Sequence, residues 1–85
     1  MKDKAQYIDL LNETHTWPVE YLFKFIAKKE FVDQVLDLFP LEKIETNKSK
    51  NGNYISFSMK KVVKSAEEVL EIYEMIQTIK GVISL

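Results

Sequence analysis

The stretch Ser49-Lys50-Asn51-Gly52-Asn53-Tyr54 decides the fold, because it predicts a β-hairpin in the middle of the chain. Asn-Gly is the dipeptide that best tolerates positive φ at both central positions of a type I′ turn. That turn twists as paired strands twist, so Asn-Gly between two strand-like runs is the strongest short-range signal for a hairpin. We therefore expect two antiparallel strands joined at this point.

The strand after the turn, expected over residues 53–63, alternates between apolar and polar side chains. The apolar set, expected on the core face, is Ile55, Phe57 and Met59. The outward set is Tyr54, Ser56, Ser58 and Lys60. The strand before the turn, expected over residues 41–50, is charged and irregular, which suits the edge of a sheet.

A helix is predicted on each side of the hairpin. The helix over residues 29–39 has an apolar stripe at helical spacing, formed by Val32, Val35, Leu36 and Phe39, and Pro40 ends it. The second helix begins at the capping box Ser65-Ala66-Glu67-Glu68 and ends before Gly81. Its apolar stripe is Val69, Ile72, Tyr73, Ile76 and Ile79.

Two further strands complete the pattern. Residues 19–27 alternate, and the larger set, expected on the core face, is Val19, Tyr21, Phe23 and Phe25. Leu22 and Ile26 fall on the opposite face. Residues 82–85 form a short final strand. Residues 1–17 precede this pattern as a lead-in, either a short helix or a disordered tail, and residues 18–85 form the domain.

The element order is therefore β-α-β-β-α-β, which predicts the α+β class. With right-handed crossovers, this order gives a ferredoxin-like fold: a four-stranded antiparallel sheet with two helices on one face. The other face of the sheet is expected to be open to solvent or to a partner.

Composition excludes several classes of function. The chain of 85 residues has no Cys, which excludes disulfides and thiolate metal sites and suits a reducing cytoplasm. No apolar run is long enough to span a bilayer, and the N-terminal residues lack a secretory signal. His15 is the single histidine and is expected as an exposed loop residue, so we predict no catalytic residue, no metal site and no cofactor. Four acidic residues of the second helix are expected to form a solvated face: Glu67, Glu68, Glu71 and Glu74.

Several short motifs resemble a known family. Trp17-Pro18 before the first strand and the hairpin stretch 49–54 are similar to those of the YbeD-like bacterial family, domain of unknown function 493. Members of that family look like ACT domains, small regulatory modules that bind amino acids at dimer interfaces. The resemblance implies an ACT-like fold over residues 18–85 and a regulatory or ligand-sensing role. ACT-type ligand sites usually use a Gly in the loop after the first strand, where this chain has Ala27-Lys28-Lys29-Glu30.

The expected open face supplies the candidate interaction surface, formed by Leu22, Ile26, Tyr54, Ser56 and Ser58. Leu22 and Ile26 are either covered by Tyr7, Leu10 and Leu11 of the lead-in or buried in a partner. The hairpin residues of the family motif are expected to be structural: Asn51, Gly52, Asn53 and Tyr54.

These observations favour a non-enzymatic cytoplasmic module that binds a protein partner or forms a homodimer. One alternative is a domain that senses a small molecule such as an amino acid. Another is RNA binding through a basic hairpin, since residues 43–64 hold six Lys and a single Glu. The net charge of −1, the absence of Arg and the polar outward set of residues 54–60 make nucleic acid the weaker of the two.

Overall fold

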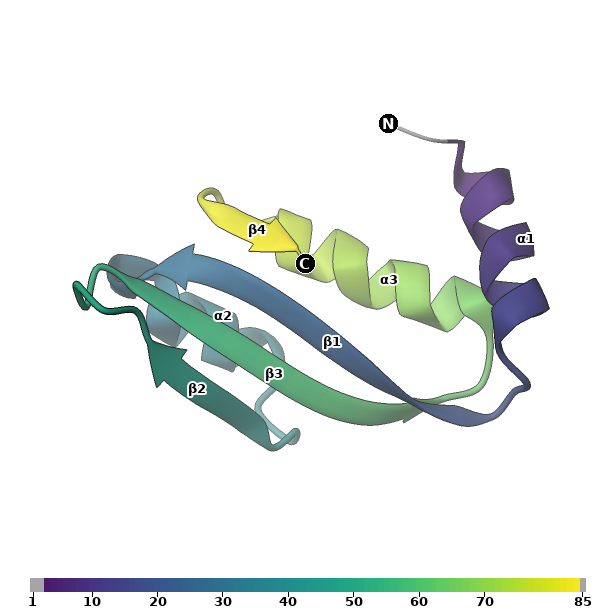
Figure 1. The fold of residues 1–85 in the computed structure, drawn as a ribbon, viewed down its shortest axis with the longest axis horizontal. Helices are drawn as coiled ribbons and strands as arrows, with labels where there is room; N and C mark the ends of the chain where they lie inside the picture. The colour runs from purple at the N-terminus through teal and green to yellow at the C-terminus, as the bar shows by residue number, and fades with distance from the viewer. Residues whose placement is uncertain (1–2, 85) are drawn as a thin grey trace.

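The computed structural model describes residues 3–84, which form three α-helices and four strands (Figure 1). The helices are α1 (Lys4–Thr14), α2 (Val32–Leu38) and α3 (Ala66–Gln77). The strands are β1 (Val19–Lys28), β2 (Ile44–Lys48), β3 (Tyr54–Val63) and β4 (Val82–Ser84). A single 3₁₀ turn, Lys29–Phe31, joins β1 to α2.

The four strands form one antiparallel sheet in the order β2-β3-β1-β4. From β1 onward the elements follow each other as β-α-β-β-α-β, so the predicted ferredoxin-like α+β fold is confirmed. The two long strands lie at the centre and pair over their whole length, from Val19 opposite Val63 to Lys28 opposite Tyr54. The charged strand β2 is an edge, as predicted, but it is shorter than residues 41–50.

The hairpin is confirmed, but its predicted type I′ turn is wrong. Gly52 has a φ of 72°, whereas Asn51 does not have a positive φ. The Ser49 amide donates to the Tyr54 carbonyl at 2.9 Å, and the Gly52 amide donates to the Ser49 carbonyl at 2.9 Å. The Ser49 hydroxyl also accepts from the Tyr54 amide at 3.2 Å. The loop therefore spans four residues, and it needs left-handed backbone at its glycine alone.

The core lies between the sheet and the pair α2 and α3. Phe25 of β1 stacks on Phe57 of β3 with ring centroids 5.2 Å apart, and both are fully buried. Val35 of α2 and Ile76 of α3 are buried in the same cluster, so both helices cover one face of the sheet. The prediction that Leu36 belongs to the buried stripe is wrong, because Leu36 is 36% exposed at the edge of a stripe whose centre, Val35 and Phe39, is buried.

The predicted start of α3 is confirmed. The Ser65 hydroxyl accepts a hydrogen bond from the Glu68 amide at 3.2 Å. The Glu68 carboxylate accepts from the Lys64 amide at 3.4 Å, one residue earlier than in a standard capping box. Gly81, with a φ of 81°, follows the helix and turns the chain into β4.

The lead-in forms a helix, and it packs on the helical side of the molecule. Leu11 of α1 is buried in the core cluster, and Lys4 forms an ion pair with Glu74 of α3 at 3.1 Å. Figure 1 shows α1 standing beside α3, away from the hairpin. Tyr7 and Leu10 line a groove between these two helices. Of the two alternatives left open for Leu22 and Ile26, cover by the lead-in is therefore wrong.

Candidate interaction surface

The face of the sheet opposite α2 and α3 carries the candidate residues, and we call it the open face. Its central part consists of alternate residues of the two long strands: Leu22, Lys24, Ile26 and Lys28 from β1, and Tyr54, Ser56, Ser58 and Lys60 from β3. Glu45 and Asn47 of β2 and Ile83 of β4 border it on either side. Glu20 and Val62 lie at one end.

The register places the five predicted surface residues on the same face of the two long strands. Ile26 lies opposite Ser56 on one side and opposite Ile83 on the other. Leu22 and Tyr54 lie at opposite ends of this central row, with exposed fractions of 45% and 43%. The side chains of Ile26, Ser56 and Ser58 are half-buried, and the Ser56 hydroxyl donates to the Asn47 carbonyl at 3.4 Å. All five residues therefore belong to one continuous surface.

Two apolar residues extend this surface beyond the predicted set. Ile83 is 60% exposed and Val62 is 61% exposed. The sequence did not predict Ile83 as part of this surface, because only the register of β4 against β1 shows that Ile83 lies opposite Ile26. For Val62 the signal was present in the sequence, since it continues the outward set of β3 by two residues.

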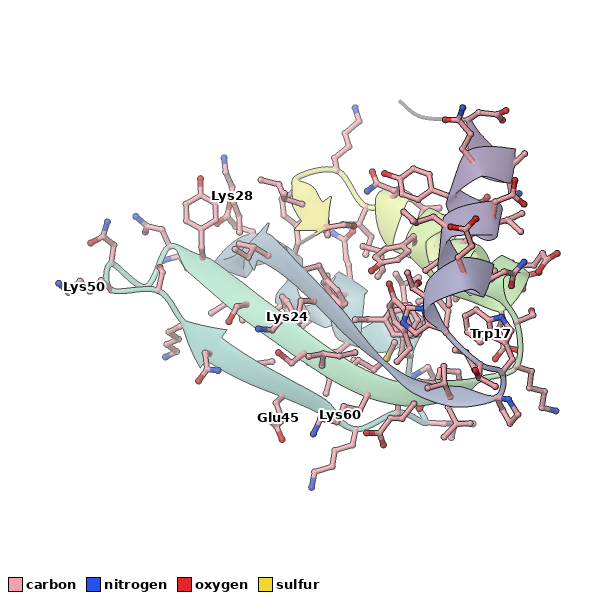
Figure 2. All side chains as sticks on the ribbon, turned by 45° about the vertical axis from the view of Figure 1, so that its right-hand side comes forward. Trp17, Lys24, Lys28, Glu45, Lys50 and Lys60 are labelled. Carbon is pink, nitrogen blue, oxygen red and sulfur yellow. The ribbon has the colours of Figure 1, made fainter. Side chains whose placement is uncertain are left out.

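The open face is also rich in lysine. Lys24 lies opposite Ser58, Lys28 lies opposite Tyr54, and Lys60 lies opposite Leu22. The ion pairs among residues 3–84 join Lys4 to Glu74 and Lys61 to Glu42, so none involves these three lysines. Figure 2 shows Lys24, Lys60 and Glu45 along the sheet, between Lys50 at the hairpin tip and Trp17 beside α1.

A cluster of aromatic side chains lies where α1 leads into β1, at the end of the long strands opposite the hairpin. The His15 ring stacks on Trp17 with ring centroids 5.6 Å apart, and its centroid lies 5.4 Å from that of the tilted Tyr21 ring. The Trp17 indole N–H donates to the Asn12 side-chain oxygen at 2.7 Å. His15 lies in the loop directly after α1, as expected, but its expected exposure is wrong, because the residue is half-buried. His15 therefore packs between the end of α1 and the aromatic rings of Trp17 and Tyr21.

A groove of about 820 Å³ lies between α1, α3 and the end of β4. It is lined mainly by apolar and aromatic side chains, among them Tyr7, Leu10, Tyr21, Leu70 and Tyr73. Burial raises the pKa of the Tyr73 phenol above its ordinary value, and a hydrogen bond with Tyr21 adds to the shift. The groove can hold a small molecule. Its polar lining comes from the three tyrosines together with Lys4, Glu74, Gln77 and Ser84.

Between residues 3 and 84, no three His, Asp or Glu side chains come together as a possible metal site. The same residues contain no helix that is both long and apolar enough to cross a membrane. Glu67, Glu71 and Glu74 are exposed on α3, as expected for a solvated face.

Comparison with known proteins identifies a family but no characterised relative. The family model described as "Protein of unknown function (DUF493)" matches residues 12–85, which confirms the resemblance noted in the sequence. No curated protein and no solved structure matches the chain.

Proposed function

We propose that this chain, a member of the DUF493 family of proteins of unknown function, is a non-enzymatic interaction module. Its open face binds a protein partner. The observation that carries this proposal is the exposure of Leu22, Tyr54 and Ile83 on a face that none of the three described helices covers. Aliphatic side chains gathered on one exposed face are typical of a contact surface.

The exposed aliphatic residues are not needed to complete the core. The core face of the sheet is closed by α2 and α3, and its central residues Phe23, Phe25 and Phe57 are fully buried without help from the open face. An antiparallel sheet with one solvated face normally places polar residues outward. Leu22, Ile26 and Ile83 depart from that rule, which a partner on this face explains.

The test begins with capture of partners from the native cytoplasm, where we place the protein, followed by titration of the purified pair. Leu22→Glu combined with Ile26→Glu is expected to abolish binding, because it places two carboxylates in an apolar contact. The matched control is Leu41→Glu, since Leu41 is 96% exposed in the loop between α2 and β2. This control is expected to bind as the unmodified chain does.

The same variants separate a partner from a second copy of the chain. If the open face forms a homodimer, sedimentation of the unmodified chain gives a dimer, and the Leu22→Glu and Ile26→Glu variant gives a monomer. Equal binding by the double variant and by the unmodified chain, with both folded, contradicts the proposal. So does loss of binding in the Leu41→Glu control alone.

The groove between α1 and α3 supports a second candidate function, the sensing of a small molecule such as an amino acid. Its volume and its three tyrosines suit a ligand with an apolar body and a few polar groups. A bound ligand raises the melting temperature of the folded chain. A thermal-shift screen of amino acids is expected to find such a ligand, and replacement of Leu10 by Trp, which fills the groove, is expected to remove the shift. A flat screen argues against sensing.

A further inference from the structure

We infer that the partner of the open face is an acidic segment of another protein, one that carries carboxylates beside aliphatic side chains. The inference rests on the proposed function and names the chemistry of its partner. It follows from the charges on the open face, from the apolar residues between them, and from the way in which these two sets are interleaved.

The lysines of the open face lie among its aliphatic residues. Lys60 lies opposite Leu22, and Lys24 and Lys28 flank Ile26 along the outward side of β1. Their amines have no carboxylate partner among the described ion pairs. A bound segment therefore meets cations and aliphatic groups at alternating positions, and carboxylates beside leucine-like side chains complement both.

Acidic residues of this chain lie at the margins of the open face. Glu45 borders it on β2, beside Ser58 and diagonal to Lys60 in the register, and Glu20 lies at its end beside Val62. Both carboxylates are nearer to Lys60 than to Lys28, so neither reduces the positive charge near Lys28. The hairpin adds Lys50 at its tip, beyond the Lys28 end of β1 (Figure 2). The positive charge that has no neighbouring carboxylate is thus concentrated at the hairpin end of the face, at Lys28 and Lys50.

A second copy of the chain fits this surface poorly. A symmetric dimer through the open face brings identical patches together. Each copy brings the three lysines of the open face but only two glutamates at its margins. The interface between two copies then holds an excess of positive charge, which opposes association. The charges therefore favour a different protein over a homodimer.

RNA also fits poorly, although it is an anion. Protein sheets that bind single-stranded RNA present several aromatic rings for base stacking. The open face offers Tyr54 alone, and its next positions along β3 are Ser56 and Ser58. A phosphate backbone also leaves Leu22 and Ile83 without an apolar contact, whereas a polypeptide can cover them.

The test uses two amphipathic peptides of equal length with leucines at identical positions, one with glutamates and the other with lysines elsewhere. Each is titrated into the isotope-labelled full chain while backbone amide resonances are followed by NMR. The acidic peptide is expected to shift the resonances of β1 and β3 and to bind more weakly as salt rises. Replacing Lys24, Lys28 and Lys60 by Gln is expected to weaken binding of the acidic peptide about tenfold. Each exposed ion pair contributes a fraction of a kcal/mol, and the three losses add up to about this factor.

The matched control replaces by Gln three exposed lysines that lie outside the four strands, Lys29, Lys64 and Lys80. It is expected to bind the acidic peptide as the unmodified chain does. Equal binding of the acidic and basic peptides at the open face overturns the acidic partner and leaves the proposed function standing. If neither peptide shifts the open face, the acidic partner is overturned, and the Leu22→Glu and Ile26→Glu capture experiment decides the proposed function separately.

Two further arms address the other occupants. Single-stranded oligouridine that shifts the same resonances as strongly as the acidic peptide overturns the inference in favour of a nucleic acid. Concentration-dependent dimerisation in sedimentation, lost in the Leu22→Glu and Ile26→Glu variant, overturns it in favour of a second copy.

Discussion

Val62 and Val63 are neighbours in β3, and the same substitution at each measures whether the two faces of the sheet differ as described. Val63 is fully buried on the core face, whereas Val62 is 61% exposed on the open face. Val63→Ala removes two buried methyl groups and leaves a cavity, which is expected to cost about 2 kcal/mol of unfolding free energy. Val62→Ala is expected to cost about 0.5 kcal/mol or less, because most of its side chain already contacts water.

The assay is urea unfolding followed by far-ultraviolet circular dichroism and by the fluorescence of Trp17, the single tryptophan. With a slope of about 1 kcal/mol per molar urea, Val63→Ala shifts the midpoint by about 2 M and Val62→Ala by about 0.5 M. Each titration is repeated at lower protein concentration, since a dimer makes the midpoint depend on concentration. Equal losses at the two positions, independent of concentration, would refute the open face.

Three further predictions concern single positions. Ser65→Ala removes the side-chain cap of α3 and is expected to cost about 1 kcal/mol in the same unfolding assay; an unchanged midpoint would contradict the cap. Gly81→Ala is expected to cost about 2 kcal/mol or more, because φ is positive there and the new Cβ would lie 3.0 Å from the Phe31 ring. Gly52→Ala, with positive φ but open space around it, is its control and is expected to cost about 1 kcal/mol; a larger loss than at Gly81 would contradict the contact. Burial raises the pKa of the Tyr73 phenol, so above pH 10.0 the folded chain keeps a proton that the unfolded chain loses. The contribution of this phenol to the free energy of unfolding is therefore present below pH 10.0 and is lost as the pH rises further. Unfolding free energies measured on both sides of that pH are expected to fall less in Tyr73→Phe; an identical fall would show that Tyr73 is not the source.

The long strands were predictable because a strand's side chains alternate with period two. Phe23 and Leu22 differ by one position, and the pattern assigns them to opposite faces without any knowledge of the partner strand. The start of α3 was predictable for a similar reason, since the Ser65 cap is a local interaction. The sheet order then follows from the order of elements and the handedness of their crossovers.

The features that the sequence did not predict depend on contacts between distant residues. The side on which α1 packs depends on contacts of Leu11 with the core, which no local pattern encodes. The burial predicted for Leu36 of α2 was wrong because spacing alone does not show how wide a strip of the helix its neighbours cover. The place of Ile83 on the open face could not be predicted, because it depends on the register of β4 against β1.

The most direct test of the open face is the accessibility of its methyl groups in the free protein. A soluble paramagnetic probe broadens the NMR signals of methyl groups that it can approach. The signals of Leu22, Val62 and Ile83 are predicted to broaden strongly, while those of Val63 and Ile76 remain sharp. Leu22 and Ile83 signals that stay as sharp as that of Ile76, at every protein concentration, would contradict the account.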